Sequence, residues 1–436
     1  MHRIAGLLIV IGVLTGGAAS PCNGEEVTPA SMTLSNMKAL GNSEEGKAGR
    51  INSYGSIIFS SGGQVMVATC SRLSKRRNIR PSDFSSEVQV FQVGEQYSLR
   101  KVVPLADKSG GLFLPASKQD EVLYISSQRK KPAEHQVDIL STESKVPLAT
   151  FEYPGTTAHP FAMNWNQRLF AICGTTAEDD HSIDAERTIS LWDVNTRKGK
   201  ARFSVGKTLV TEIAFSPDGT KLAVVGTLFT KEMVPFQLSP DELPRQIETT
   251  KKQGILHLWD LVSNELIYRK TLPDYHLDST AFSTDGKALA IGGIDGTKKV
   301  KEGVLGWDLV VTDSIGKIMW IDIESAEWRV TAELEMPRPA RSPKEKLGTA
   351  RIECLAFSSD GRFLASGIGS WNRGGKWGGI RIIDNESHKV ISVVLEKHPQ
   401  VVTCVAFSPD GTELAAGTAD GVLKVWDITK IMEPPD

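Results

Sequence analysis

The sequence predicts an all-β protein assembled from seven repeated units of short antiparallel strands. The hexapeptide AFSPDG occurs at 214–219 and 406–411, with the variants AFSTDG at 281–286 and AFSSDG at 356–361. An apolar segment follows each copy, and further along a second apolar segment often ends in Trp-Asp, as in LHLWD and LKVWD. Self-similarity of this kind indicates a repeat architecture, in which each unit is one small group of strands.

The hexapeptide carries the chemistry of a tight turn. In the SPDG stretch at 216–219, serine stands at the first turn position, proline at the second and glycine at the fourth, as a type I turn favours. Proline restricts φ, aspartate can hydrogen-bond the nearby backbone, and glycine accepts unusual angles. Phe215 is therefore expected to end one strand of a hairpin and Leu222 to begin the next.

Each unit is expected to run strand, turn, strand, loop, strand, turn, strand. Seven such units follow one another at 52–103, 108–153, 157–204, 208–272, 276–334, 350–396 and 400–430. The pair Trp307-Asp308 matches the Trp-Asp mark by its letters, but 316–330 fits the end of the fifth unit better. We therefore assign 296–315 to an insertion and place Ile321-Asp322 in the Trp-Asp position.

The N-terminus is predicted to be a signal peptide. Residues 1–20 have a short basic start, an apolar run from Ala5 to Leu14 and a tail of small residues, the layout of a secretory signal. The apolar run is shorter than the roughly 20 residues that cross a bilayer. We expect a secreted or periplasmic protein without a membrane span; a buried N-terminal strand or helix is the alternative.

Composition and cysteine usage further narrow the class of protein. Charged residues make up 23% and the net charge is −2, whereas a nucleic-acid binder is expected to be strongly basic. Five cysteines without CxxC spacing are interpreted as buried thiols that pack as small apolar groups, although a secreted chain permits disulfides. Cys22 follows the apolar run, but Pro21 precedes it where the bacterial lipobox that it resembles has Gly or Ala, so no lipid anchor is expected.

Together, AFSPDG, the apolar run, Asp-Gly and VWD resemble the repeat of WD-repeat β-propellers. The resemblance covers about residues 50–430 and is strongest in the fourth and seventh units. It implies a seven-bladed β-propeller of four-stranded antiparallel blades at 51–430, with a C-terminal tail at 431–436. Members of the family also have a structural tetrad inside their blades, which only the last unit matches fully, through His398, Thr418, Asp420 and Trp426.

The last unit ends after its third strand. In the resembled family a strand from the other terminus closes the ring, which assigns this role to the leader at 21–50. The stretch 27–45 is the candidate, around Met32–Leu40. An unpaired edge at this seam would otherwise favour aggregation.

The units differ most in the connection between their second and third strands. Five of these connections are lengthened, whereas the last unit uses only Asp420-Gly421; the long ones are at 71–86, 177–187, 229–253, 296–315 and 370–378. In an antiparallel four-stranded unit this connection always emerges on the same side. Insertions on one face of a repeat protein often mark its binding face; neutral drift in loops is the alternative.

Two of these loops hold the candidate partner-binding residues. The loop at 71–86 is basic and the loop at 370–378 is rich in glycine and tryptophan, and the candidates in and beside them are Lys75, Arg76, Arg77, Arg80, Trp371, Arg373 and Trp377. Because the loop at 177–187 is acidic, the face would be split by charge, which favours electrostatic selection of a partner. Trp and Arg are favoured contact anchors. Solvated loop charge and rings packed on a neighbouring blade are the alternatives.

No catalytic motif is present: the sequence contains no nucleophile elbow, HExxH, phosphate-binding glycine loop or EF-hand. The acidic stretch at 178–184 is interpreted as a solvated loop. We expect a non-enzymatic scaffold with a protein partner and no cofactor, metal or nucleic acid. The alternative is an enzyme or small-molecule binder, resembling propeller lactonases or quinoprotein dehydrogenases, at the channel mouth, where Glu212 and Glu353 are the nearby acids.

Overall fold

A computed structural model describes most of the chain from residue 50 onward. The described ranges are 50–60, 62–73, 84–94, 97–105, 109–115, 122–131, 134–141, 147–154, 160–164, 166–175, 184–236, 245–304, 307–334, 351–370, 377–398 and 400–429. The predicted signal peptide at 1–20 and the predicted ring-closing stretch at 27–45 lie outside them, and both stay predictions.

The described strands form seven antiparallel sheets, each with its strands in chain order or the reverse. The first three are β1 (Arg50–Phe59), β2 (Val65–Leu73), β3 (Phe84–Gln92) and β4 (Ser98–Leu105); β5 (Ser109–Pro115), β6 (Val122–Lys131), β7 (Glu134–Ser141) and β8 (Ala149–Pro154); and β9 (Phe161–Asn164), β10 (Leu169–Gly174), β11 (Arg187–Asp193) and β12 (Lys198–Gly206).

The remaining four sheets follow the same plan, with three described strands in the last. They are β13 (Leu209–Phe215), β14 (Lys221–Phe236), β15 (Arg245–Asp260) and β16 (Glu265–Pro273); β17 (Tyr275–Phe282), β18 (Ala288–Val304), β19 (Trp307–Asp322) and β20 (Trp328–Leu334); β21 (Arg351–Phe357), β22 (Phe363–Ser370), β23 (Trp377–Asp384) and β24 (Val390–His398); and β25 (Val402–Phe407), β26 (Glu413–Thr418) and β27 (Leu423–Asp427).

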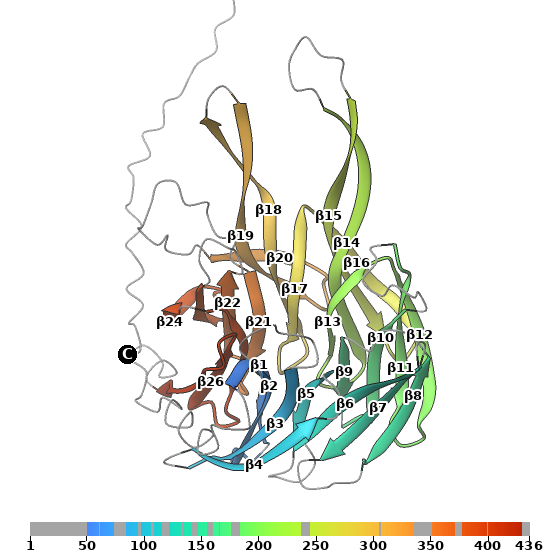
Figure 1. The fold of residues 1–436 in the computed structure, drawn as a ribbon, viewed down its shortest axis with the longest axis vertical. Helices are drawn as coiled ribbons and strands as arrows, with labels where there is room; N and C mark the ends of the chain where they lie inside the picture. Colours follow the sequence, from blue (N-terminus) through green and yellow to red (C-terminus); the bar gives the residue numbers. More distant parts are fainter. Residues whose placement is uncertain are drawn as a thin grey trace, which may run out of the picture.

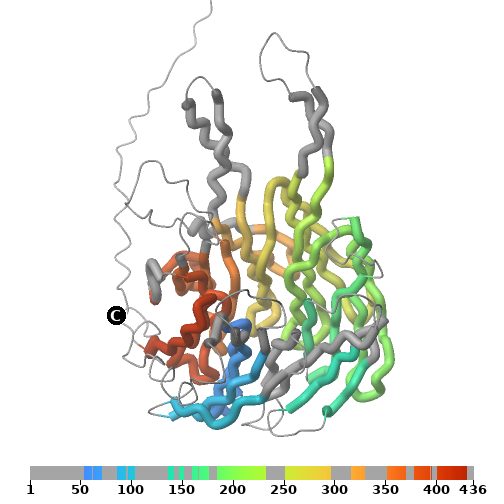
Figure 2. Tube along the Cα trace, in the orientation of Figure 1, coloured from blue at the N-terminus to red at the C-terminus, as the bar shows by residue number. Residues whose placement is uncertain are grey.

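The seven sheets are arranged as a closed ring. Each first strand contacts the first strand of the next sheet, from β1 through β5, β9, β13, β17 and β21 to β25, and β25 contacts β1 again. The earliest and latest described sheets therefore lie side by side, as the blue and red tubes of Figure 2 show. This is a seven-bladed propeller with the first strands innermost, which confirms the predicted fold class.

The core is divided among the interfaces between sheets. Seven clusters of buried apolar side chains lie one at each interface of the ring among the described residues. Because a second strand is covered on both faces, it forms a continuous apolar run rather than an alternating one. In β14, Leu222, Ala223, Val224 and Val225 are all fully buried, which explains the apolar segment after each hexapeptide.

The hexapeptides form the expected hairpin turns. In the fourth sheet, Gly219 N donates to Ser216 O at 2.9 Å, and Gly219 has a φ of 71°. Ser216 Oγ accepts from Lys221 N at 2.9 Å and donates to Asp218 Oδ1 at 2.5 Å. The turns at 283–286, 358–361 and 408–411 repeat the same backbone bond, so this part of the hexapeptide is structural.

The two longest insertions are extensions of the sheets. Strands β14 and β15 pair from Lys221–Asp260 out to Phe236–Arg245, and β18 and β19 pair from Ala288–Asp322 out to Val304–Trp307. The sequence predicted loops at 229–253 and 296–315. In the structure the ladder of backbone hydrogen bonds continues into each insertion, because its two halves pair with each other along their length. Ile321 pairs with Leu289 inside the fifth sheet, which confirms that Trp307-Asp308 is not the repeat mark.

Candidate functional site

The innermost strands carry a β-bulge at the same height in several blades. The pairing with the second strand is interrupted between Val210 and Glu212, between Leu277 and Ser279, between Ile352 and Cys354, and between Val402 and Cys404. The extra residues are Thr211, Asp278, Glu353 and Thr403. Bulges re-aim a side chain and are frequent beside functional sites, and these four extra residues are all polar.

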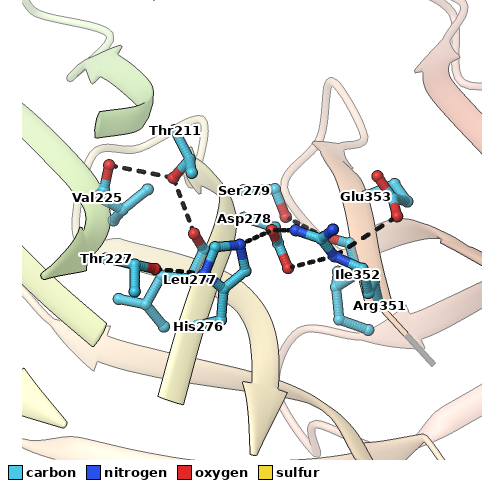
Figure 3. Close-up of polar contacts among 10 residues, drawn as sticks. All are labelled: Thr211, Val225, Thr227, His276, Leu277, Asp278, Ser279, Arg351, Ile352 and Glu353. Carbon is cyan, nitrogen blue, oxygen red and sulfur yellow. Dashed lines mark hydrogen bonds and ion pairs between the residues drawn. The ribbon is translucent and has the colours of Figure 1, made fainter. Parts of the chain in front are cut away.

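Polar side chains from three neighbouring blades meet around these bulges (Figure 3). His276 Nδ1 lies 2.6 Å from Thr227 Oγ1, and His276 Nε2 lies 3.0 Å from Asp278 Oδ1. Arg351 donates to both oxygens of Asp278, with Nε 3.3 Å from Oδ2. Arg351 Nε also lies 3.8 Å from Glu353 Oε1. We call Thr227, His276, Asp278, Arg351 and Glu353 the axial relay.

Burial explains why the relay needs so many partners. The Asp278 side chain is 6% exposed and that of Arg351 is 29% exposed. A carboxylate removed from water is costly unless it is paired and hydrogen-bonded, and the two-pronged guanidinium bond supplies both requirements. Burial opposes the charge of Arg351, but the bond to Asp278 holds the pKa of Arg351 above its usual value. The relay therefore fixes the spacing of the fourth, fifth and sixth blades.

Glu212 adds a second acid beside the relay. It follows the bulge in β13 and accepts the backbone N–H of Thr280 from β17. Burial raises the pKa of Glu212 to about 8, with the Thr280 N–H acting to lower it and Asp278 to raise it. Glu212 is consequently protonated at neutral pH. As a carboxylic acid it links two innermost strands, β13 and β17, through its bond to Thr280 N–H.

Hydroxyl groups also link the innermost strands directly. Thr211 Oγ1 lies 2.8 Å from Leu277 O of the next blade, and Ser279 Oγ lies 3.1 Å from Ile352 O (Figure 3). Thr403 Oγ1 lies 2.6 Å from Tyr54 O across the seam of the ring. These hydrogen bonds hold neighbouring innermost strands, and the polar groups on them, at fixed positions relative to one another.

The relay lies on the elaborated side of the disc. In each antiparallel blade, the start of the first strand and the end of the second strand share one edge. His276 and Arg351 stand at the starts of β17 and β21, and the His276 ring lies 6.4 Å from that of Phe229, on the extended part of β14. Figure 1 shows the β14–β15 and β18–β19 hairpins extending from this side. We call the end of the ring axis at the axial relay the axial mouth. It lies on the same side of the disc as the elaborated face, and the two form one continuous surface.

The predicted partner-binding residues fall almost entirely outside the described chain. Lys75, Arg76, Arg77, Arg80, Trp371 and Arg373 belong to such segments, while Trp377 begins β23 and pairs through its backbone with Ser370. The side chain of Trp377 is also outside the described part. Their role at the elaborated face stays a prediction.

Part of the predicted tetrad can be located. Thr418 Oγ1 donates to Asp420 Oδ1 at 2.5 Å, and Trp426 is 1% exposed, with no hydrogen-bond partner for Nε1 among the described side chains. His398 ends β24 opposite Gly378, and its side chain lies outside the described part. The structure therefore places a Thr418–Asp420 pair at this turn and leaves the full tetrad a prediction.

Sequence reasoning missed His276, Asp278 and Arg351. It began the first strands of the fifth and sixth units at the apolar residues next to the hexapeptide, whereas β17 begins at Tyr275 and β21 at Arg351. The signal that could have identified this site was the pair of polar residues His276 and Asp278, two positions apart in the chain. A bulge shifts the face that a residue occupies, so alternation alone could not place them.

The described residues contain no group of three or more His, Cys, Asp or Glu side chains arranged to hold a metal ion. Within the same residues, no helix has the length and apolar character needed to cross a membrane. The axial relay brings carboxyl, guanidinium, imidazole and hydroxyl groups together on three neighbouring blades.

Comparison with known proteins agrees with the fold. The family model for the WD domain, G-beta repeat, matches residues 342–382 and 389–427. These two repeats lie within a ring of seven antiparallel sheets, and in both respects the chain is similar to WD-repeat β-propellers.

Two curated relatives are similar to a part of the chain. The COMPASS component SWD1 of Saccharomyces cerevisiae is 34% identical over 87 residues, which are 19% of this chain and 19% of that protein. The small ribosomal subunit protein RACK1y of Oryza sativa subsp. japonica is 33% identical over 82 residues, which are 19% of this chain and 23% of that protein. The similarity thus spans about a fifth of each relative's length.

Proposed function

We propose that the protein is a non-enzymatic WD-repeat scaffold that binds a protein partner through its elaborated face. One observation carries this proposal: β14, β15, β18 and β19 each run for 16 or 17 residues on the same side of the ring, whereas β26 and β27 have 6 and 5. The names of both relatives, a COMPASS component and a ribosomal subunit protein, describe members of assemblies, which supports a scaffold role here.

The face has the properties of a docking platform. Loops and extensions held on a rigid framework are favoured places for binding, and the axial relay and the hydroxyl contacts hold the innermost strands together beneath them. The basic loop at 71–86 and the Trp-rich loop at 370–378 would add electrostatic selection and aromatic anchors.

A pull-down with matched variants tests the face. The tagged protein is used to capture partners from the fraction in which it resides, and the captured protein is identified by mass spectrometry. Shortening 71–86 and 370–378, or the double reversal Arg76→Glu/Arg77→Glu, is expected to abolish capture. The reversal Lys287→Glu/Lys389→Glu changes charge equally on exposed turns of the opposite face and is expected to retain it. Capture that survives both loop deletions would refute the proposed face.

Export is the second element of the proposal. It rests on the signal-like layout of residues 1–20 and places the protein in a secreted or periplasmic location. Cell fractionation with N-terminal sequencing of the mature chain tests it. The expected mature N-terminus lies near residue 20, and a chain that stays in the cytoplasm with Met1 intact would contradict export.

A small-molecule site or enzyme at the axial mouth is the second candidate function. The observation that favours it is the axial relay, because it brings His276, Asp278 and Arg351 together on innermost strands. Native mass spectrometry of the purified protein, combined with thermal shifts against metals and common cofactors, tests this candidate. A bound group whose stabilising effect disappears in His276→Ala would support it, and a negative screen leaves the scaffold function.

A further inference from the structure

We propose that the outer rim of the third blade is a second docking site, which takes an acidic protein segment carrying an apolar anchor residue. A hollow of about 390 Å³ lies on the two outer strands of this blade, β11 and β12, and is lined by residues 190–192 and 199–202. We call it the rim hollow. Its volume falls in the lower part of the range typical of ligand sites. It is distinct from the elaborated face, so the proposal does not depend on the proposed function.

The rim hollow is surrounded by positive charge that the described protein does not neutralise. Arg197, Lys198, Lys200 and Arg202 are exposed, and none of them makes an ion pair within the described residues. By contrast, Lys207, just beyond the same strand, pairs with Asp184 at 3.2 Å. Four solvated cations within six residues attract an acidic partner and steer its approach.

Asp193, an acidic residue at the end of β11, is already hydrogen-bonded within its own turn. Asp193 Oδ1 accepts from Thr196 N at 2.7 Å and from Thr196 Oγ1 at 2.9 Å. These bonds from Thr196 lower the pKa of Asp193, to which the charge of Lys200 also contributes. Asp193 therefore stays ionised within its own turn, and the ammonium of Lys200 and the guanidinium of Arg202 remain open to carboxylates from outside.

The floor of the hollow supplies an apolar contact. Trp192 is half-buried, and its ring packs edge-on against Phe151 of the second blade, with centroids 5.8 Å apart. This packing holds the indole in place while part of it stays accessible. At Gly199, which pairs with Trp192 across the two strands, a Cβ would meet no other atom within 4 Å, so the space beside the indole is open. An apolar side chain can be seated there, flanked by carboxylates that reach Lys200 and Arg202.

The backbone of β12 adds a third kind of contact. In the described part of the third sheet, β12 is the edge strand, and Figure 1 shows it at the outside of the ring next to β11. An edge strand presents unpaired N–H and C=O groups, and lysines on such an edge also serve to prevent pairing between proteins. Docking of an acidic partner and protection of the edge against pairing predict different results when the charges of these cations are reversed.

The test measures binding of a short acidic probe to the full-length protein. A fluorescein-labelled peptide Glu-Asp-Phe-Asp-Glu is titrated by anisotropy, with Glu-Asp-Gly-Asp-Glu and Lys-Lys-Phe-Lys-Lys as control peptides. We expect saturable binding of the first peptide, weaker binding of the glycine peptide because it lacks the anchor, and none of the basic peptide. Raising the salt concentration is expected to weaken binding, because surface charges are screened.

Two matched double variants locate the binding. Lys200→Glu/Arg202→Glu is expected to lower the affinity by about tenfold or more, whereas Lys287→Glu/Lys389→Glu, with the same change in net charge, is expected to leave it unchanged. Trp192→Leu supplies an independent check, since it should weaken the phenylalanine peptide more than the glycine peptide. Circular dichroism of each variant verifies that the fold is retained.

Three outcomes would overturn the proposal. The first is equal affinity in the wild type and in Lys200→Glu/Arg202→Glu. The second is self-association of that variant in analytical ultracentrifugation with unchanged peptide binding, which would assign the cations to edge protection alone. The third is equally good competition by a single-stranded oligonucleotide of matched charge, which would indicate unspecific attraction of polyanions. Failure here leaves the elaborated face untouched, because its variants change different residues.

Discussion

At the scale of single residues, the hexapeptide turns combine a serine, an aspartate and a glycine in one repeated hydrogen-bonded unit. Ser283 Oγ donates to Asp285 Oδ1 at 2.6 Å, and Lys287 N donates to the same oxygen at 3.0 Å. The hydroxyl of Ser283 and the N–H of Lys287 lower the pKa of Asp285. These aspartates were predicted from the sequence alone because a turn is specified by the few residues within it.

The variant Asp285→Ala tests this role. It is expected to lower the free energy of unfolding by roughly 1 kcal/mol at pH 7, the usual contribution of one hydrogen bond. Because the folded-state pKa is depressed, this contribution is present above the unfolded pKa and is lost as the pH falls through the folded value. Urea unfolding at pH 7 and pH 3 should show a smaller difference between the two proteins in acid. Glu265→Ala, at the exposed start of β16, is the control, and a difference as large at pH 3 as at pH 7 would contradict the assignment.

Glu212 is expected to show the opposite dependence on pH. Burial raises its pKa from 4.5 to about 8, so its contribution to stability is full below the unfolded pKa and is lost as the pH rises through 8. Glu212→Gln keeps an oxygen for the Thr280 N–H and cannot ionise. Thermal unfolding followed from pH 5 to pH 9 should show equal midpoints in acid and a higher midpoint for the variant in alkali. A difference that does not vary with pH would show that Glu212 is not the titrating group.

At the scale of elements, bulged first strands and extended hairpins build the axial mouth. The strands themselves could be predicted, since apolar runs between turn residues are typical of buried strands. The bulges at Thr211, Asp278 and Glu353 could not, because a bulge depends on the pairing of two strands and leaves no mark in either one. The insertions at 229–253 and 296–315 were predicted as loops for a similar reason: each half becomes a strand only against the other.

A double-mutant cycle on Asp278→Asn and Arg351→Gln measures the relay. Breaking a fully buried ion pair costs about 3–5 kcal/mol, and because Arg351 is partly exposed we expect about 2 kcal/mol for Asp278→Asn. The coupling energy from urea unfolding should exceed 1 kcal/mol, since two hydrogen bonds join the pair. The same cycle on the exposed Lys207–Asp184 pair should give under 1 kcal/mol. Equal coupling in the two cycles would mean that the relay adds no more than a surface ion pair.

At the scale of the whole molecule, the ring is closed by contact between its first and last described blades. Tyr97 OH donates to Glu413 Oε2 at 2.6 Å across this seam. Side chains of the first and seventh sheets, among them Tyr54, Phe91, Cys404 and Val425, share one buried cluster there. Burial, together with the hydrogen bond to Glu413, raises the pKa of Tyr97, so its hydroxyl remains a donor at neutral pH. The predicted closing strand at 27–45 would add to a seam that already has its own core.

The pair across the seam can be tested by Tyr97→Phe and Glu413→Met, which remove the donor and the acceptor respectively. Each change is expected to lower the free energy of unfolding by about 1 kcal/mol, and the double variant should lose less than the sum because the two act through one bond. Equilibrium unfolding in urea is the measurement. Additive losses would show that the hydrogen bond does not hold the seam.

The sequence by itself determined the repeat, the turns, the number of blades and the side on which the long connections emerge. These features are local: a type I turn, an apolar run and a connection length are each contained in a short stretch of chain. Only the tertiary structure decided that His276, Asp278 and Arg351 meet at the axis, and that cations without an ion-pair partner among the described residues surround a hollow on the third blade. Asp278 and Arg351 are 73 residues apart in the chain, and they become neighbours only because the ring sets two innermost strands side by side.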